Sequence, residues 1–464
     1  MRIGFVSGDG LPVSGFIVLL RNVMALGIGR GYCEPEVVAD FGYAWRCDKS
    51  AFFATGNSEL PQPAWLRVNA DSTLEGIDPT VLAQRLTYIR RQIARYSSLH
   101  ADEVDAAKDE ISRLVPLFTR HFERWIAANS LDWIIAVNMT LSDAVPATRG
   151  LVEATATTRV PLLQWDHDLY GSCGVTEPGY GRVYPVAPNE LCELPRAQGH
   201  NMWVVSTKDL QAEGASYRTD PLPVHAPAVL PTLGSLDRDA GDRFLTQHRI
   251  DSRAPLIHNP VRLTEVKGAH LALDAFSAIC EEWTGKVAPV LLLWGALRED
   301  EDFAAGLVRQ ARSQGTFEQV RFLDGVPVAT TADESSVQLD ETDLLLLAKR
   351  SNGGVMFTPA VPDVETIGLG PALAGSAGLP CLVTPYHALR QVYGEQFAVV
   401  QATSCAPSDI KDAARRFAAY LGANRYPQAF AERNRAALND AFDAKGWLNI
   451  WAAMQDAVSP RSTT

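Results

Sequence analysis

Short apolar runs alternate with amphipathic stretches along the whole chain. The runs include RIGFVSG, WIIAVNM and VPLLQWD in the first half, and VLLLWGA, GGVMFTP and PCLVTP in the second. Strands that are apolar nearly throughout are typical of a parallel sheet covered on both faces. The stretches between them have helical spacing, so we predict repeated βαβ units and the α/β fold class.

A passage rich in Pro, Gly and Asp at 225–242 separates the two sets of strands. We therefore predict two doubly wound Rossmann-like domains, at 1–235 and 236–440, that face each other across a cleft. Two long amphipathic segments predict a helical insertion at about 78–129 in the first domain. The last stretch, 441–464, is expected to hold a helix that packs back on the N-terminal domain.

Composition narrows the classes of partner. The 464 residues carry a formal net charge of -12 without a dense Lys/Arg tract, which argues against nucleic acid. Seven scattered cysteines, with no close pair, predict neither a disulfide framework nor a structural zinc site. The opening residues do not resemble a signal peptide, and no apolar run approaches the roughly 20 residues of a membrane span. We therefore expect a cytoplasmic protein without stable membrane association.

The predicted helical insertion begins with an arginine-bearing segment, TVLAQRLTYIRRQIARYSS. It carries Arg85, Arg90, Arg91 and Arg95. One interpretation is a site for an anionic acceptor or an acidic membrane surface. The other is an ordinary solvated helix face, which we favour because the segment that follows is acidic enough to offset the arginines.

The second half opens with a motif suited to phosphate. In NPVRLTEVKGAHLALDAF an apolar strand leads to Arg262, then to Lys267 and Gly268, and then to an amphipathic helix. Two cations beside a helix start suit a diphosphate, because Arg offers a planar fork and Lys a point charge. The alternative is that both side chains are simply solvated in a loop.

A glycine-spaced turn follows in VETIGLGPALAG. Gly368 and Gly370 allow backbone N–H groups to face a ligand at a helix N-terminus, and Pro371 fits the first helical turn. Glu365 stands just before the turn, where its carboxylate could accept hydrogen bonds from sugar hydroxyls. The alternative is a βα loop with a capping carboxylate.

The first half offers His167, which follows the apolar strand of VPLLQWDHDLYG. A carboxylate can fix an imidazole tautomer, so we expect Asp166 or Asp168 to orient this ring in a ligand site. The alternative is a structural histidine at a strand end. The two aspartates also have Asp-x-Asp metal spacing, but the layout makes a divalent metal unnecessary and we expect none. The acidic run around Asp300 is interpreted as a solvated loop.

The order and spacing of these motifs resemble the large retaining glycosyltransferase family four, which has the GT-B fold. In that family an Arg, four residues and then Lys-Gly open the donor domain, as Arg262, Lys267 and Gly268 do here. Its second signature, Glu-Pro-Phe-Gly-Leu followed by a helix and Gly-Leu/Thr-Pro, is similar to Glu365–Leu369 with Gly378–Pro380. The resemblance covers nearly the whole chain, and the donor half carries its most specific part.

The resemblance implies a role for each donor-side position. Arg262 and Lys267 would hold the leaving diphosphate, and Glu365 would hydrogen-bond the transferred sugar. The backbone at Ile367, Gly368 and Leu369 would meet the sugar and phosphate. In the N-terminal loop GDGLPVSGF, Gly15 resembles the family's glycine near the donor phosphates.

The resemblance also implies the reaction. A sugar would pass from a nucleotide-diphosphate-sugar donor to a small soluble acceptor, with retention, by a front-face route without metal or cofactor. His167 would lie near the reacting carbon, and we assign Asp166 and Asp168 to the acceptor side. Neither the donor base and sugar nor the acceptor is indicated by the sequence, and a homodimer is left open.

The sequence departs from the family pattern at one informative position. Leu373 stands where a second Glu usually binds the ribose, and Thr366 and Ile367 replace Pro and Phe. Another residue could recognise the donor, the donor could lack a bound nucleoside, or transfer activity could be lost. Two other functions therefore stay open: a GT-B glycoside phosphorylase or sugar-phosphate-using synthase, and a non-catalytic sugar-binding or partner-activating subunit.

Overall fold

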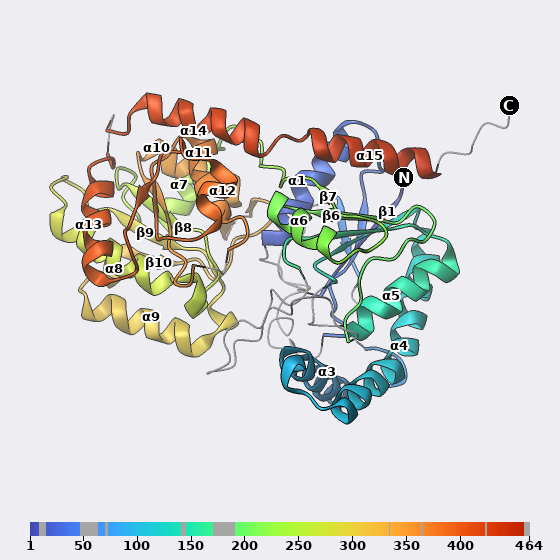
Figure 1. Ribbon diagram of the computed structural model, residues 1–464. Helices are drawn as coiled ribbons and strands as arrows, with labels where there is room; N and C mark the ends of the chain where they lie inside the picture. Colours follow the sequence, from blue (N-terminus) through green and yellow to red (C-terminus); the bar gives the residue numbers. More distant parts are fainter. Residues whose placement is uncertain are drawn as a thin grey trace. The chain divides into compact units, whose positions relative to one another are not determined.

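The computed structural model describes residues 1–8, 15–46, 64–69, 73–140, 145–169, 191–333, 335–362, 365–422 and 425–458. These residues form two compact units. The first comprises the described parts of Met1–Glu59, Pro63–Ala228 and Ala444–Thr464, and the second comprises those of Val229–Asp443. Each unit has a parallel sheet flanked by helices (Figure 1), so the predicted class of two doubly wound α/β domains is confirmed.

The sheet of the first unit has seven parallel strands in the order β3-β2-β1-β4-β5-β6-β7. Every residue of β1, β2, β4 and β5 is buried, which explains their continuous apolar sequence. The strands are β1 (Ile3–Ser7), β2 (Val37–Asp40), β3 (Leu66–Val68), β4 (Trp133–Val137), β5 (Leu162–Asp166), β6 (Met202–Val205) and β7 (Val224–His225). The helices include α1 (Gly15–Gly29), α5 (Val145–Thr158) and α6 (Lys208–Ser216).

Two long helices form an insertion after β3. They are α3 (Pro79–Ala94) and α4 (Ala101–Asn129), joined through the short 3-10 turn η2 (Tyr96–Ser98). Asp78 caps α3 by accepting from the backbone N–H groups of Thr80 and Val81. The apolar side of α3 packs in one core cluster with α4, and α5 packs closely on α4 because Gly150 leaves room for Phe118.

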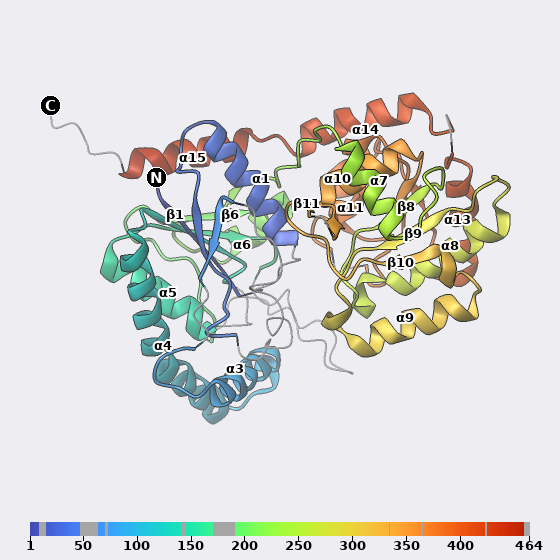
Figure 2. The ribbon, with the colours of Figure 1, turned by 180° about the vertical axis from the view of Figure 1, so that it is seen from behind.

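The chain returns to the first unit in its last helix, α15 (Lys445–Val458). Trp447 and Trp451 are fully buried, and the indole N–H of Trp447 donates to the Pro227 carbonyl at 3.0 Å. The Trp133 indole of β4 donates to the Met454 carbonyl at 3.0 Å. Figure 2 shows α15 beside α1, where Gly27 makes space for the Trp451 ring.

The sheet of the second unit has six parallel strands in the order β10-β9-β8-β13-β14-β15. They are β8 (Leu256–Asn259), β9 (Val290–Leu293), β10 (Val320–Phe322), β13 (Gly354–Phe357), β14 (Cys381–Val383) and β15 (Val400–Gln401). A two-stranded antiparallel ribbon, β11 (Thr331–Ala332) with β12 (Val337–Gln338), lies outside this sheet.

Helices cover both faces of the second sheet (Figure 1). One layer contains α8 (Ala269–Glu282), α9 (Glu301–Ser313) and α13 (Pro407–Ala418). The other contains α10 (Glu341–Arg350), α11 (Leu369–Ala377) and α14 (Gln428–Ala441). The remaining helices are α7 (Arg238–Gln247) and α12 (Ala388–Tyr393). In the part of the chain that is described, none of the helices combines the length and apolarity of a membrane span.

Candidate functional site

The strand order of the second unit marks a ligand site. From β8 the chain proceeds to β9 and β10 on one side, whereas β13 pairs with the other side of β8. Open α/β sheets bind ligands beyond the carboxyl ends of their strands at such a reversal. The loops that leave β8 and β13 there carry the Arg262–Gly268 and Glu365–Gly368 motifs. Topology therefore brings together two motifs that lie far apart in the sequence.

Lys267 and Glu365 form an ion pair across these two loops. The Lys267 Nζ lies 2.8 Å from the Glu365 Oε1, although the residues are 98 positions apart. Their side chains are only 24% and 13% exposed, so solvent screens the pair less than it screens a surface pair. Among the described residues the pair makes this one hydrogen bond, which leaves two ammonium protons and most carboxylate lone pairs for a ligand. The predicted phosphate-binding and sugar-binding side chains thus share one location.

Gly268 holds the first loop against the second. It has a φ of 72°, and a Cβ at this position would overlap the carbonyl oxygen of Thr358 after β13. The Thr358 hydroxyl donates to the Gly268 carbonyl at 2.9 Å, and the Ala360 N–H donates to the Val266 carbonyl at 3.0 Å. Only glycine fits this close approach, which accounts for the Lys-Gly step of the motif.

Arg262 forms an ion pair with Glu299, a residue that sequence reasoning did not select. The Glu299 side chain is 5% exposed and the Arg262 side chain 42% exposed. The expectation of a solvated loop is therefore wrong for Glu299, whereas Arg298, Glu301 and Asp302 of the same run are exposed. Glu299 lies in the 3-10 turn η5 (Leu297–Glu299) after β9, and Asp300 caps α9 by accepting from the Phe303 N–H at 3.0 Å.

The N-terminus of α11 has no side-chain cap among the described residues. Gly368 occupies the N-cap position with a φ of 68°, and its carbonyl accepts a hydrogen bond from the Tyr393 hydroxyl at 2.6 Å. The amides of Leu369 and Gly370 in the first turn are of the kind that binds anions at helix N-termini. This end of α11 lies at the same edge of the sheet as the Lys267–Glu365 pair.

Ile367 and Leu373 of this motif belong to the core, whereas Leu369 is partly exposed. Leu373 is also buried, on α11, so the position of the family's second Glu is filled here by a packed apolar side chain. Leu373 therefore has a packing role where the family has its ribose-binding Glu. The first turn of α11 holds no acidic residue that could replace that Glu.

In the first unit the strand order reverses between β1 and β4. Gly15 is the first residue of α1, which follows β1. Most of the predicted glycine loop, at 9–14, lies outside the described residues. His167 follows β5, which is the neighbour of β4, so it lies one strand from this reversal.

A hydroxyl, not a flanking carboxylate, contacts the predicted histidine ring. The His167 Nδ1 lies 2.6 Å from the Ser206 Oγ after β6, and the backbone N–H of His167 donates to the Asn138 Oδ1 at 2.7 Å. Burial lowers the pKa of His167 to about 3, so its ring is neutral at neutral pH. The expectation that Asp166 or Asp168 orients this ring is therefore wrong: the ring nitrogen contacts the Ser206 hydroxyl instead.

The flanking aspartates have other partners. The Asp166 carboxylate accepts from the Trp203 indole N–H at 2.8 Å, and burial raises the pKa of Asp166 to about 7. Asp166 has no exposed surface here with which to meet an acceptor. Asp168 is partly exposed and accepts from the Asn138 amide at 3.4 Å. Neither aspartate joins a group of three metal-ligating side chains, and no such group occurs among the described residues.

Asn138 and Ser206 are the contacts that sequence reasoning missed in the first unit. Asn138 ends WIIAVN with a φ of 51°, a left-handed conformation that Asn tolerates better than most residues. An Asn directly after an apolar strand is therefore a usable signal. Ser206 follows MWVV in the same way, but its pairing with a histidine 39 positions away has no local signature.

Several solved structures are similar to this chain along nearly its whole length. A glycosyltransferase from Rickettsia africae covers 98% of this chain and 98% of its own, at 11% identity and a TM-score of 0.56. HepE from Anabaena, solved with UDP and glucose, covers 99% and 100% at 14% identity and a TM-score of 0.58. The sucrose-phosphate synthase of Thermosynechococcus elongatus covers 98% and 98% at 12% identity and a TM-score of 0.57.

At these identities the likeness concerns the fold alone. Neither a family model nor a curated protein matches the sequence. The two-sheet α/β architecture that the resemblance to GT-B glycosyltransferases implied is confirmed.

Proposed function

We propose that this chain is a glycosyltransferase that moves a sugar from a nucleotide-diphosphate-sugar donor to a small acceptor with retention of configuration. The observation that carries the proposal is the Lys267–Glu365 pair at the carboxyl ends of β8 and β13, beside the α11 N-terminus. A cation, a carboxylate and helix-terminal amides together suit a diphosphate joined to a sugar. The scattered cysteines favour a cytoplasmic location.

The reaction needs charge stabilisation more than covalent chemistry. In the proposed step the bond from the anomeric carbon to the diphosphate oxygen breaks, and a bond to an acceptor hydroxyl oxygen forms. The hydroxyl proton passes to the leaving phosphate, so no base is required from the protein. Lys267 and Arg262 would oppose the negative charge that develops on the diphosphate. Glu365 would orient the sugar hydroxyls, and the neutral His167 would contact the sugar or acceptor without adding charge.

The donor is proposed to be a nucleotide sugar, and uridine is the first base to test because HepE was solved with UDP and with UDP-glucose. Leu373 keeps a second candidate open, since a glycoside phosphorylase or sugar-phosphate-using synthase has no ribose to hold. A non-catalytic sugar-binding subunit is the third.

Calorimetric titration of the purified chain with UDP, GDP, ADP, dTDP and sugar 1-phosphates tests the proposal. We expect one nucleoside diphosphate to bind, and Lys267→Gln to weaken this binding at least tenfold, on the scale of a lost charge-assisted contact. Lys349→Gln is the matched control, because Lys349 is an exposed lysine on α10 of the same unit.

Three outcomes would contradict the donor, the catalytic activity or the role of Lys267. Binding of sugar 1-phosphates alone would favour the phosphorylase or synthase. Binding without product formation in the presence of sugar nucleotides and a panel of acceptors would favour the non-catalytic subunit. Equal losses in the lysine variant and its control would remove Lys267 from the site.

A further inference from the structure

The Arg262–Glu299 pair has its carboxylate inside the protein and its cation towards solvent. The Glu299 side chain is 5% exposed, whereas that of Arg262 is 42% exposed. Taking a carboxylate out of water costs free energy unless a cation or hydrogen bonds compensate it. Glu301 and Asp302, in the same acidic run, are exposed instead. Glu299 is thus the member of the run that is buried, and its ion-pair partner is the arginine of the phosphate motif.

The loops that carry these two side chains are packed against each other. Glu299 lies in η5 after β9, and Arg262 follows β8, the strand that pairs with β9. A Cβ at Gly295 would lie 2.5 Å from the Leu263 nitrogen and 2.7 Å from the Val261 carbonyl oxygen. The turn after β9 therefore touches the backbone on both sides of Arg262. The separation of the two side chains is set by this backbone packing.

Both ends of the Glu299 turn are also held by hydrogen bonds. At its start the Leu297 N–H donates to the Asp324 Oδ1 at 2.7 Å. At its end Asp300 accepts from the Phe303 N–H at 3.0 Å, where α9 begins. A group that orients a binding side chain does so best from a rigid element. The turn places Glu299 in that situation.

The Arg262–Glu299 pair belongs to the same site as the Lys267–Glu365 pair. Arg262 and Lys267 lie on one loop, which Gly268 holds against the backbone after β13. Arg262 meets a carboxylate from the β9 side, and Lys267 meets one from the β13 side. The four side chains carry two positive and two negative charges, so the pairs add no excess positive charge. What the carboxylates supply is order, because they hold two long and flexible cations in place.

We propose that Glu299 is a positioning residue that holds the Arg262 guanidinium in the orientation in which it binds the leaving diphosphate. The inference rests on the proposed function, which places Arg262 at the donor. A guanidinium presents its N–H donors in one rigid plane, so a carboxylate at one edge fixes the direction of the others. An arginine that is already ordered loses less rotamer freedom when a phosphate binds.

A double-mutant cycle on nucleotide affinity tests this role. UDP is the first probe in calorimetric titration of the full chain, and GDP, ADP and dTDP replace it if it does not bind. We expect Glu299→Gln to weaken binding about tenfold, but less than about twofold when Arg262→Gln is already present. Damage to the fold would lower the affinity in both backgrounds, so the cycle separates positioning from a structural role.

A second variant covers the case in which Glu299→Gln does not fold. Glu299→Asp keeps the charge but withdraws it by one CH₂ group. We expect this variant to weaken nucleotide binding by a smaller factor than Glu299→Gln. Its loss should also disappear in the Arg262→Gln background, because the effect is transmitted through the guanidinium.

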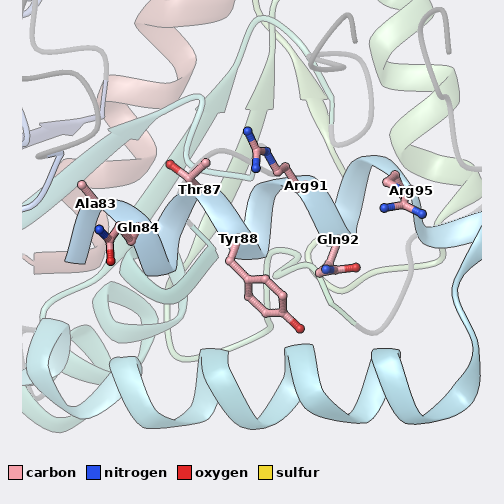
Figure 3. A pocket seen from close by; sticks show the side chains of 7 residues that line it. All are labelled: Ala83, Gln84, Thr87, Tyr88, Arg91, Gln92 and Arg95. Atoms are coloured by element: carbon pink, nitrogen blue, oxygen red, sulfur yellow. The ribbon is translucent and has the colours of Figure 1, made fainter. Parts of the chain in front are cut away.

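Two matched controls test whether the place of each charge matters. Glu282→Gln removes a carboxylate that pairs with Arg415 in the same unit, where the two side chains are 51% and 52% exposed. Arg95→Gln removes an exposed arginine at the end of α3 in the first unit, where it lines a hollow beside that helix (Figure 3). Both variants should bind the nucleotide as the native chain does.

Three results would overturn the role of Glu299. The first is unchanged affinity in Glu299→Gln. The second is tighter binding, which would mean that Glu299 competes with the phosphate for Arg262. The third is a loss of the same size with and without Arg262→Gln.

Titration with inorganic pyrophosphate and sugar 1-phosphates separates this inference from the proposed function. Binding of these compounds without any nucleotide would count against the nucleotide-sugar donor alone. The same cycle, measured with the phosphate compound that binds, would then decide the role of Glu299. A native chain that binds neither nucleotides nor these phosphates would overturn both.

Discussion

Two tyrosines near the α11 N-terminus have hydroxyls in opposite circumstances. The Tyr393 hydroxyl donates to the Gly368 carbonyl, and both groups are buried. The Tyr386 hydroxyl is buried beside the same glycine but has no hydrogen-bond partner among the described residues. A buried polar group without a partner costs stability, whereas a buried hydrogen bond adds to it.

We therefore expect opposite effects from removing each hydroxyl. Tyr393→Phe should lower the free energy of unfolding by about 1–2 kcal/mol, since it also leaves the Gly368 carbonyl unpaired. Tyr386→Phe should be neutral or raise it by up to about 1 kcal/mol. Urea unfolding of both variants measures the difference. Equal destabilisation by the two substitutions would mean that Tyr386 has a partner in solution.

At the scale of elements, the end of β5 places two titrating groups side by side with opposite pKa shifts. The Asp166 pKa is raised to about 7, so the folded chain keeps this proton where the unfolded chain loses it near about pH 4. This contribution to stability is complete in acid and is lost as pH rises through about 7. The His167 pKa is lowered to about 3, so its contribution is complete above about pH 6.5 and is lost in acid.

Between about pH 4 and 6.5 the two contributions to the unfolding free energy change in opposite directions with pH. Asp166→Asn removes the first, so the pH dependence that His167 causes should become visible. The Asn oxygen can still accept from the Trp203 indole. We expect the variant to lose about 2 kcal/mol of unfolding free energy between pH 7 and 5, more than the native chain loses. Urea unfolding at pH 7, 6 and 5 checks this. Parallel pH curves for the two proteins would show that Asp166 does not hold a proton in this range.

The elements themselves could largely be predicted from the sequence. Strands buried on both faces are apolar throughout, and helices buried on one face are amphipathic, so both kinds of element have a recognisable sequence pattern. The Lys267–Gly268 step was recognisable because it resembles a family motif, although the close approach of Thr358 that requires its glycine comes from 90 positions away. Glu299 and Ser206 were not, because their partners, Arg262 and His167, follow other strands, and a carboxylate in an acidic run has no local sign of burial. The predicted acceptor role of Asp166 failed because the sequence around a buried aspartate does not differ from that around an aspartate in a ligand site.

At the scale of the whole molecule, α15 ties the end of the chain to the first unit. Trp451 is fully buried and packs on Gly27 of α1. Replacing a buried tryptophan with alanine costs about 3–5 kcal/mol. We expect Trp451→Ala to speed amide hydrogen exchange in β1 and β4, while β8 and β13 exchange as in the native chain.

Trp283→Ala is the matched control for this experiment. Trp283 lies in the second unit and is only partly buried, and its indole donates to the Val287 carbonyl at 2.8 Å. This variant should leave exchange in β1 and β4 unchanged. Faster exchange in both units of the Trp451 variant would show that the two do not unfold separately.

The division of the chain also has a consequence for its synthesis. The described residues of the second unit all lie between Val229 and Asp443, whereas those of the first lie on both sides of this segment. Domains generally fold as they leave the ribosome, beginning with the N-terminal one. Here the order of completion is reversed: the second unit can close while the first still waits for Trp447 and Trp451. A ribosome that stops at Asp443 would release a finished second unit attached to a first unit without Trp447 and Trp451, so that Trp165, which packs on Trp447, would lose part of its cover from solvent.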